Sequence, residues 1–191
     1  MRELKGKSLI EIPNKYIAFD IETTGLDPMY DEIIEIGAIK IEDGKEIETF
    51  STLIKPDYEI DEFITELTGI TNEMVMDAPK INEVLPKFMD FIKDSVIIGH
   101  NVNFDINFIY DNLINEDMNP ITNDFVDTLR LSRRLLPELK HHRLSDLANY
   151  YNIDTTGSHR SLTDVRITID IFKNLEKLVE SKYSNIESFN A

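Results

Sequence analysis

Two acidic residues end a run of apolar residues near the start of the chain. In the stretch YIAFDIETTG, residues 16–25, Asp20 and Glu22 are separated by a single isoleucine. Because side chains alternate along a strand, the two carboxylates would share one face of it, roughly 7 Å apart. Like charges on a mostly buried strand repel, so one carboxyl should stay protonated unless a cation neutralises the pair. The alternative is that the strand ends here and both acids face water.

Two further acids, Asp105 and Asp164, fall on the apolar faces of predicted helices. At helical spacing, Asp105 is in line with Phe108 and Leu113, and Asp164 is in line with Ile171. An acid on a packed face needs a partner. A buried ion pair with an arginine is one explanation for each, and compensation of the helix dipole is another for Asp105.

One histidine lies close to these acids in the sequence. His159 precedes Asp164 by five positions, in a loop that contains Gly157, where it could present a base to a site; a structural histidine is the alternative. The chain has no cysteine, so a metal site must use oxygen or imidazole ligands. Oxygen-rich sites suit Mg²⁺ or Mn²⁺, and a pair of such ions can hydrolyse a phosphodiester. The spacing indicates a two-metal carboxylate site and no more.

The apolar pattern also predicts the elements that would carry these side chains. Strands are predicted over residues 16–22, 31–42, 46–55, 95–100 and 123–128. Helices are predicted over residues 81–94, 103–118, 129–137, 143–153 and 161–180. Asp43 and Gly44 favour a hairpin between the second and third strands, and Asn103 is a predicted N-cap. The pattern predicts one α/β domain in which helices cover a sheet.

Length and composition limit the class of protein. The 191 residues, 41% of them apolar, suit one domain over residues 15–181, with an N-terminal extension at 1–14 and a frayed tail at 182–191. We read no signal peptide and no membrane span, and we expect a cytoplasmic protein. A net charge of −16 argues against broad electrostatic binding of nucleic acid. It does not exclude a nucleic-acid enzyme, because bound cations dominate the charge of a carboxylate site.

Three motifs resemble, in order, those of the DEDD exonuclease superfamily. They are DIETTG (20–25), HNVNFD (100–105) and HRSLTD (159–164). A histidine five positions before the last aspartate is typical of the DEDDh branch, whereas the sister branch has a tyrosine where this chain has Arg160. Within this branch, the chain resembles the epsilon subunit of DNA polymerase III and the exonuclease domain of the type-C bacterial replicative polymerase. The resemblance covers about residues 15–180.

The resemblance implies an RNase H-like fold, with a mixed sheet of about five strands whose first three are antiparallel. It also implies 3′-to-5′ hydrolysis of DNA that releases nucleoside 5′-monophosphates. Asp20 would bridge two Mg²⁺ or Mn²⁺ ions, Glu22 and Asp164 would hold one, and Asp105 would support the other. His159 would take the proton from the attacking water.

Four more residues match family positions that line the pocket for the 3′ end. These are Thr23, Thr24, Leu26 and Phe104, and for the two apolar ones core packing is the alternative. The family motif has alanine where this chain has Ser161, a change of similar size from which we expect no loss of activity.

The motifs leave the substrate and the partners open. Single-stranded or frayed DNA in proofreading or repair is the leading hypothesis, and a DNA polymerase subunit is a candidate partner. Trimming of RNA 3′ ends is one alternative. A polymerase-associated binding module is another, although it would usually have lost a ligand, and all five positions are present here.

A basic segment stands out in this acidic chain. Between Arg130 and Arg143 there are five arginine or lysine residues and two histidines, with only Glu138 of opposite charge. We expect part of this basic segment to follow the phosphates of an incoming strand. A solvated helix face with ion pairs is the alternative.

Overall fold

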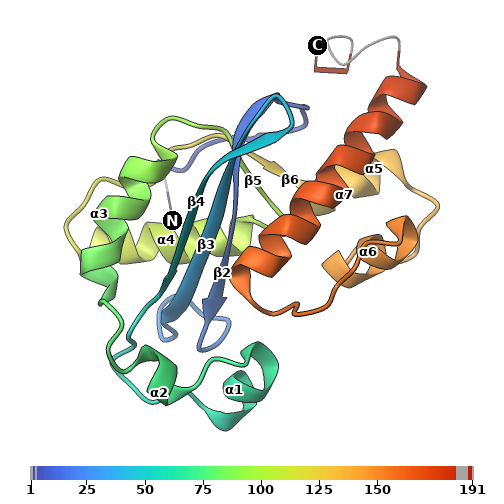
Figure 1. Ribbon diagram of the computed structural model, residues 1–191. Helices are drawn as coiled ribbons and strands as arrows, with labels where there is room; N and C mark the ends of the chain where they lie inside the picture. The colour runs from blue at the N-terminus through green and yellow to red at the C-terminus, as the bar shows by residue number, and fades with distance from the viewer. Residues whose placement is uncertain (1, 3, 184–188, 191) are drawn as a thin grey trace.

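The computed structural model describes residue 2, residues 4–183 and residues 189–190. A single mixed sheet lies at the centre, and helices cover both of its faces (Figure 1). The strands are β1 (Ser8–Leu9), β2 (Lys15–Thr23), β3 (Ile33–Glu42), β4 (Lys45–Leu53), β5 (Ile97–Gly99) and β6 (Phe125–Asp127). Their order across the sheet is β1-β6-β5-β2-β3-β4.

The three long strands form the predicted antiparallel meander. Strand β2 pairs with β3, and β3 pairs with β4. At the β3–β4 turn, Asp43 and Gly44 have φ values of 49° and 76°, and two positive φ values in a two-residue loop are the geometry of a type I′ hairpin. Strands β5 and β6 extend the sheet in parallel from β2. A sixth strand, β1, comes from the segment predicted as an extension and pairs with β6.

The helices begin after β4, and β5 and β6 lie on either side of α4 in chain order. They are α1 (Glu62–Thr68), α2 (Asn72–Val75), α3 (Ile81–Ile92), α4 (Asn103–Asn115), α5 (Thr128–Leu135), α6 (Leu144–Tyr151) and α7 (Ser161–Lys182). None of the described helices is long and apolar enough to cross a membrane.

Strand β2 is buried on both faces and separates two hydrophobic cores. Tyr16 and Ala18 belong to the core beneath α5, α6 and α7. Ile17, Phe19 and Ile21 belong to the core that includes α3 and α4. Burying one large apolar side chain contributes about 1.5–3 kcal/mol, so the alternation along β2 fixes which face each residue takes.

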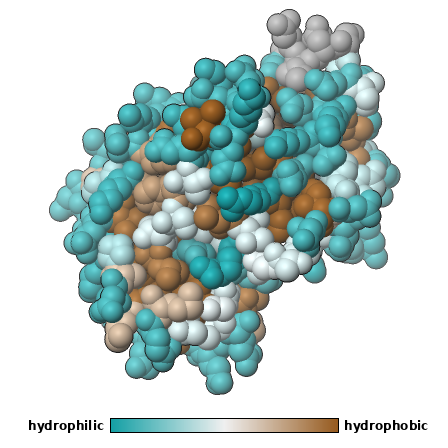
Figure 2. Space-filling model, in the orientation of Figure 1, coloured by the Kyte–Doolittle hydropathy of each residue, from teal (hydrophilic) through white to brown (hydrophobic). Residues whose placement is uncertain are grey.

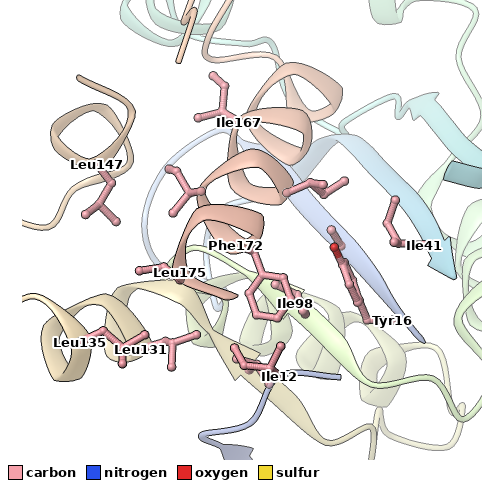
Figure 3. Packing of buried hydrophobic residues seen from close by; sticks show 14 of the residues in the cluster. Ile12, Tyr16, Ile41, Ile98, Leu131, Leu135, Leu147, Ile167, Phe172 and Leu175 are labelled. Carbon is pink, nitrogen blue, oxygen red and sulfur yellow. The ribbon is translucent and has the colours of Figure 1, made fainter. Parts of the chain in front are cut away.

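Helix α7 covers the first of these cores. The ring of Phe172 meets that of Tyr16 edge to face, with centroids 5.2 Å apart, and Figure 3 shows Phe172 beside Ile98. Asp20 and Glu22 continue the row that begins with Tyr16 and Ala18. Both acids therefore leave the strand on the side where α7 begins.

Two expectations about element ends had different outcomes. The predicted N-cap was wrong: α4 begins at Asn103, its cap residue is Val102, and no side chain caps it. The amide oxygen of Asn103 instead accepts a hydrogen bond from Lys5. Most of the predicted tail, residues 184–188 and 191, lies outside the described residues, while Phe189 is buried in the α7 core.

Candidate active site

A glycine on β3 lets α7 approach the end of β2. Gly37 is the partner of Asp20 across the antiparallel pair. A Cβ at position 37 would lie 2.6 Å from Ser161 Oγ and 2.7 Å from the Leu162 nitrogen. The first turn of α7 therefore packs directly on the sheet, which brings Asp164 next to Asp20.

Asp105 reaches the same strand end from α4. Strand β5 is short and pairs with β2 only as far as Ala18, so it offers no carbonyl oxygen to the Ile21 N–H. Asp105 Oδ1 accepts a hydrogen bond from this N–H instead, at 3.1 Å. The Asp105 side chain is buried, with 4% of the residue exposed. An acid that sequence spacing placed on the packed face thus has its partner in the β2 backbone.

Three carboxylates form a set that fits a divalent cation. One oxygen each of Asp20, Glu22 and Asp164 lies within 4.8 Å of the others. Asp164 Oδ2 accepts a hydrogen bond from the backbone N–H of His159 at 3.3 Å, but the buried Asp164 Oδ1 has no hydrogen-bond partner among the described residues. A buried, unpartnered carboxylate oxygen costs free energy unless a ligand completes it. Hard divalent ions prefer sites whose ligand atoms are all oxygens, as they are here.

Burial and mutual repulsion raise the pKa values of these acids. The pKa of Asp20 lies well above its usual value because of burial and the neighbouring charges of Asp105, Glu22 and Asp164. The pKa of Glu22 rises to about 8, through burial and then the charges of Asp164 and Glu35. Burial also raises the pKa of Asp105 to about 8, although its backbone hydrogen bonds oppose this. Without a cation, the site holds protons at neutral pH.

The loop before α7 places His159 beside the carboxylates. His159 is exposed and has a φ of 65°, which is uncommon for a residue other than glycine. The next residue, Arg160, anchors the loop through its pairing with Glu35: Arg160 Nη2 lies 2.6 Å from Glu35 Oε1. Glu35 Oε2 also accepts from the Ser161 N–H at 2.8 Å.

Glu35 is a residue that the sequence reasoning missed. It is 4% exposed and lies opposite Glu22 on β3, and its sequence distance of 125 residues from Arg160 gives no local signal. Among the described residues, no arginine forms an ion pair with Asp105 or Asp164. The ion pair considered for each acid is therefore not found in the described part of the chain.

An open pocket adjoins the carboxylates. It has a volume of about 530 Å³, and Thr23, Thr24, Leu26 and Phe104, the four predicted substrate-binding residues, all line it. Leu26 is 83% exposed, which excludes core packing for this side chain. Phe104 lines the pocket and also packs on Phe108, with ring centroids 4.9 Å apart.

Helix α1 supplies a wall of this pocket that sequence reasoning did not foresee. Phe63 and Leu67 line it, and they are 66% and 44% exposed. Figure 2 shows apolar side chains gathered over the lower end of the sheet, above α1 and α2, beside hydrophilic ones. Exposed apolar side chains around a cavity are typical of ligand sites.

The turn after β2 shapes the rim of the pocket. Thr23 Oγ1 donates a hydrogen bond to the Gly25 carbonyl oxygen at 2.6 Å. Thr24 Oγ1 accepts from the Glu32 N–H at 2.9 Å. The two hydroxyls thus fix a tight turn that holds Leu26 out over the cavity.

A mixed sheet with this order, and carboxylates from β2, α4 and α7 at one strand end, defines an RNase H-like protein. Residues 17–172 match the family described as Exonuclease (RNase_T), and the chain belongs to this exonuclease family. The predicted resemblance is thereby confirmed.

Relatives that are similar along most of this chain are bacterial DNA polymerases III of the PolC type. The DNA polymerase III PolC-type of Caldanaerobacter subterraneus is 43% identical over 97% of this chain and 13% of its own length. The PolC-type polymerase of Clostridium perfringens is 45% identical over 84% of this chain and 11% of its own length. The chain thus spans about an eighth of the length of these relatives.

Solved structures show the same fold. Escherichia coli Exonuclease I in complex with a dT13 oligonucleotide has a TM-score of 0.78 and 22% identity, covering 90% of this chain and 43% of that one. Exonuclease X in complex with 5′-overhanging duplex DNA has a TM-score of 0.69 and 24% identity, covering 92% and 99%. The expected RNase H-like architecture is confirmed.

Proposed function

We propose that this chain hydrolyses DNA from the 3′ end of a single or frayed strand and releases nucleoside 5′-monophosphates. The observation that carries this proposal is the set of three carboxylate oxygens within 4.8 Å, beside an open pocket. Membership of the exonuclease family supports the reaction type. The names of the PolC-type relatives, and the DNA in the complexes of Exonuclease I and Exonuclease X, support DNA as the substrate.

The carboxylates would hold two divalent ions, and we propose Mg²⁺ or Mn²⁺. Asp20, Glu22 and Asp164 would ligate through the oxygens that converge, and Asp164 Oδ1 would gain the partner that it lacks. Asp20 would bridge the two ions, and Asp105 would support the second from its position at Ile21. When bound, the ions supply the positive charge that favours ionisation of water and stabilises the leaving oxygen.

His159 would act as the general base. Its imidazole would take the proton from the water that attacks phosphorus, while the bond to the 3′ oxygen of the preceding nucleotide breaks. The departing 3′ oxygen takes up a proton from solvent water, so the strand is left one nucleotide shorter with a free 3′ hydroxyl, and one nucleoside 5′-monophosphate is released. The pair between Arg160 and Glu35 would keep the loop in place during this step.

The pocket would hold the terminal nucleotide. The exposed faces of Leu26 and Phe63 would pack against the base, and base stacking on apolar and aromatic side chains tolerates any sequence. Thr23 and Thr24 would present the turn to the sugar. Proofreading beside a polymerase is the role that the PolC-type relatives suggest, and a polymerase is the proposed partner.

Linear and circular DNA distinguish this activity from other nucleases. Linear single-stranded DNA incubated with the chain and Mn²⁺ should be converted to nucleoside 5′-monophosphates, identified by chromatography. Circular single-stranded DNA of the same sequence should stay intact, because it has no 3′ end. Cut circles, or nucleoside 3′-monophosphates as products, would contradict the proposal.

A further inference from the structure

A second concave surface lies outside the carboxylate site. Its cavity has a volume of about 460 Å³, and Arg133, Lys140 and Arg143 line it together with His141 and His142. Among the described residues that line it, none is acidic. In a chain with a net charge of −16, this is a local concentration of positive charge.

The structure divides the basic segment into two parts. Arg133, Lys140 and Arg143 are exposed, and within the described part of the chain none of the three forms an ion pair. Arg134 turns the other way and lies over the ring of Phe189, 5.5 Å from its centroid. These three residues are thus solvated, as the alternative expects, but lack the ion pairs that it includes.

The loop that carries Lys140 and His141 is held in place. His142 Nδ1 lies 3.0 Å from Ser132 Oγ on α5, and His142 Nε2 lies 3.2 Å from the Leu139 carbonyl oxygen. These contacts fix the loop against α5 on one side of the cavity. Because the loop is already ordered, ligand binding need not supply the entropy of ordering it.

The basic cavity continues toward the nucleotide pocket. A neighbouring cavity of about 370 Å³ shares Asn101 and Arg133 with it and is also lined by Asn103 and Asp127. Asp127 Oδ1 accepts hydrogen bonds from the Asn101 and Leu129 N–H groups at 2.9 Å each.

The first turn of α4 separates the two surfaces. Asn103 lines the basic side, and its neighbour Phe104 lines the nucleotide pocket. A strand whose 3′ end occupies the pocket can therefore pass across this turn onto the basic surface.

We propose that Arg133, Lys140 and Arg143 bind phosphates of the single strand on the 5′ side of the nucleotide in the pocket. This inference rests on the proposed exonuclease function. Cations that neutralise phosphates release counterions, which gives sequence-independent affinity. An acidic protein that must hold any strand needs such a surface, because the rest of its charge repels nucleic acid.

Binding of a single strand tests this surface. A fluorescent oligo(dT) of about 12 nucleotides is titrated with the His159→Gln protein in Mg²⁺, at several salt concentrations, so that the strand stays intact. In that background, Arg133→Gln with Lys140→Gln should weaken binding about tenfold and reduce the slope of log Kd against log salt by about 1.4. Arg133→Lys should retain most of the affinity.

A matched pair controls for net charge. Lys45 and Lys177 are exposed and line neither basic cavity, so Lys45→Gln with Lys177→Gln changes the charge equally and should leave binding nearly unchanged. Equal weakening by both pairs, or no effect of Arg133→Gln with Lys140→Gln, would overturn the inference. If the groove binds an acidic protein rather than DNA, Arg133→Gln with Lys140→Gln would have no effect on DNA binding.

A small substrate separates this proposal from the proposed function. The p-nitrophenyl ester of thymidine 5′-monophosphate fits the nucleotide pocket alone and bypasses the basic surface. With His159 intact, the double variant Arg133→Gln with Lys140→Gln should hydrolyse this ester as fast as the unmodified protein does. The KM of the double variant for the oligonucleotide should rise. If the unmodified chain cleaves neither substrate, the exonuclease proposal fails, and the binding titration still decides the fate of the basic surface.

Discussion

At the strand end, protons and a cation compete for the same carboxylate oxygens. The pKa values of Glu22 and Asp105 rise to about 8 in the folded protein, whereas such groups titrate near pH 4 in an unfolded chain. Between these values the folded state binds more protons than the unfolded state. The contribution of these groups to stability is therefore fully present below about pH 4 and is lost as pH rises through about 8.

Neutralising Glu22 should change stability in a pH-dependent way. In EDTA, Glu22→Gln should increase the free energy of unfolding at pH 8 by about 1–3 kcal/mol, because it removes a buried charge. At pH 5 the same change should have little effect, since the carboxyl is already protonated. Urea unfolding at the two pH values measures the difference.

Divalent ions should reverse the effect of this substitution. With saturating Mn²⁺ at pH 8, the unmodified protein should gain more stability than Glu22→Gln, because the ion binds the folded state through the carboxylate that the variant lacks. If Glu22→Gln in EDTA had the same effect on stability at both pH values, burial would not raise the pKa of Glu22, and the account of this residue would be wrong.

Ser161 offers a second test at a single residue. It is fully buried against Gly37, and its hydroxyl has no hydrogen-bond partner in the described part of the chain. Ser161→Ala should increase the free energy of unfolding by about 1 kcal/mol, since an unsatisfied buried hydroxyl is removed, and the DNA cleavage rate should not change. Chemical denaturation measures the first effect.

Ser132 is the matched control for Ser161. It is equally buried, but its hydroxyl donates to the Leu129 carbonyl oxygen at 3.0 Å and contacts His142. Ser132→Ala should therefore destabilise the protein. The account of Ser161 fails if both substitutions shift stability in the same direction.

Sequence alone was enough to nominate the acids of the site but not their supports. Asp20, Glu22, Asp105 and Asp164 stand out because each interrupts an apolar pattern. Glu35 interrupts one too, yet its partner Arg160 is 125 residues away, and only the fold brings the two together. Long-range pairing leaves no trace in local spacing, which is why the support of the His159 loop was missed.

At the scale of elements, the loop that leads into α7 is held by one ion pair. Arg160→Ala should reduce kcat about 10- to 100-fold, with a smaller change in KM, because the base on this loop loses its position. Arg160 donates to Glu35 from both Nε and Nη2. Arg160→Lys keeps the charge but loses this two-point contact, and it should recover part of kcat. Steady-state kinetics on a labelled oligonucleotide separates kcat from KM.

A purely structural role for Arg160 predicts something else. In that case Arg160→Ala would lower stability, since it leaves Glu35 buried and unpaired, but properly folded enzyme at low temperature would turn over at the normal rate. Normal kcat in folded Arg160→Ala protein would contradict the positioning role.

Elements were predictable where the signal is local. The β3–β4 hairpin follows from Asp43 and Gly44, which sit at its turn. Strand β1 was missed because its pairing with β6 joins Ser8 to Phe125 across most of the chain. The role of α1 was missed for a similar reason, since only the fold brings Phe63 to the pocket that Leu26 also lines.

At the scale of the whole molecule, charge is divided between two surfaces. The chain carries 36 acidic and 20 basic residues, yet no acidic residue is among the described residues that line the basic cavity. The acidic cluster would take metal ions, and the basic surface would take phosphates. The net charge alone gives no indication of this separation.

The most direct measurement of the central claim follows the 3′ end itself. DNA and RNA of matched sequence, each labelled at the 5′ end, are incubated with the pure chain and Mg²⁺ or Mn²⁺, with His159→Ala in parallel. We predict a ladder that shortens from the 3′ end, faster for DNA than for RNA, and a rate reduced at least about 100-fold in His159→Ala. No shortening of either strand, or an equal ladder with His159→Ala, would contradict the account.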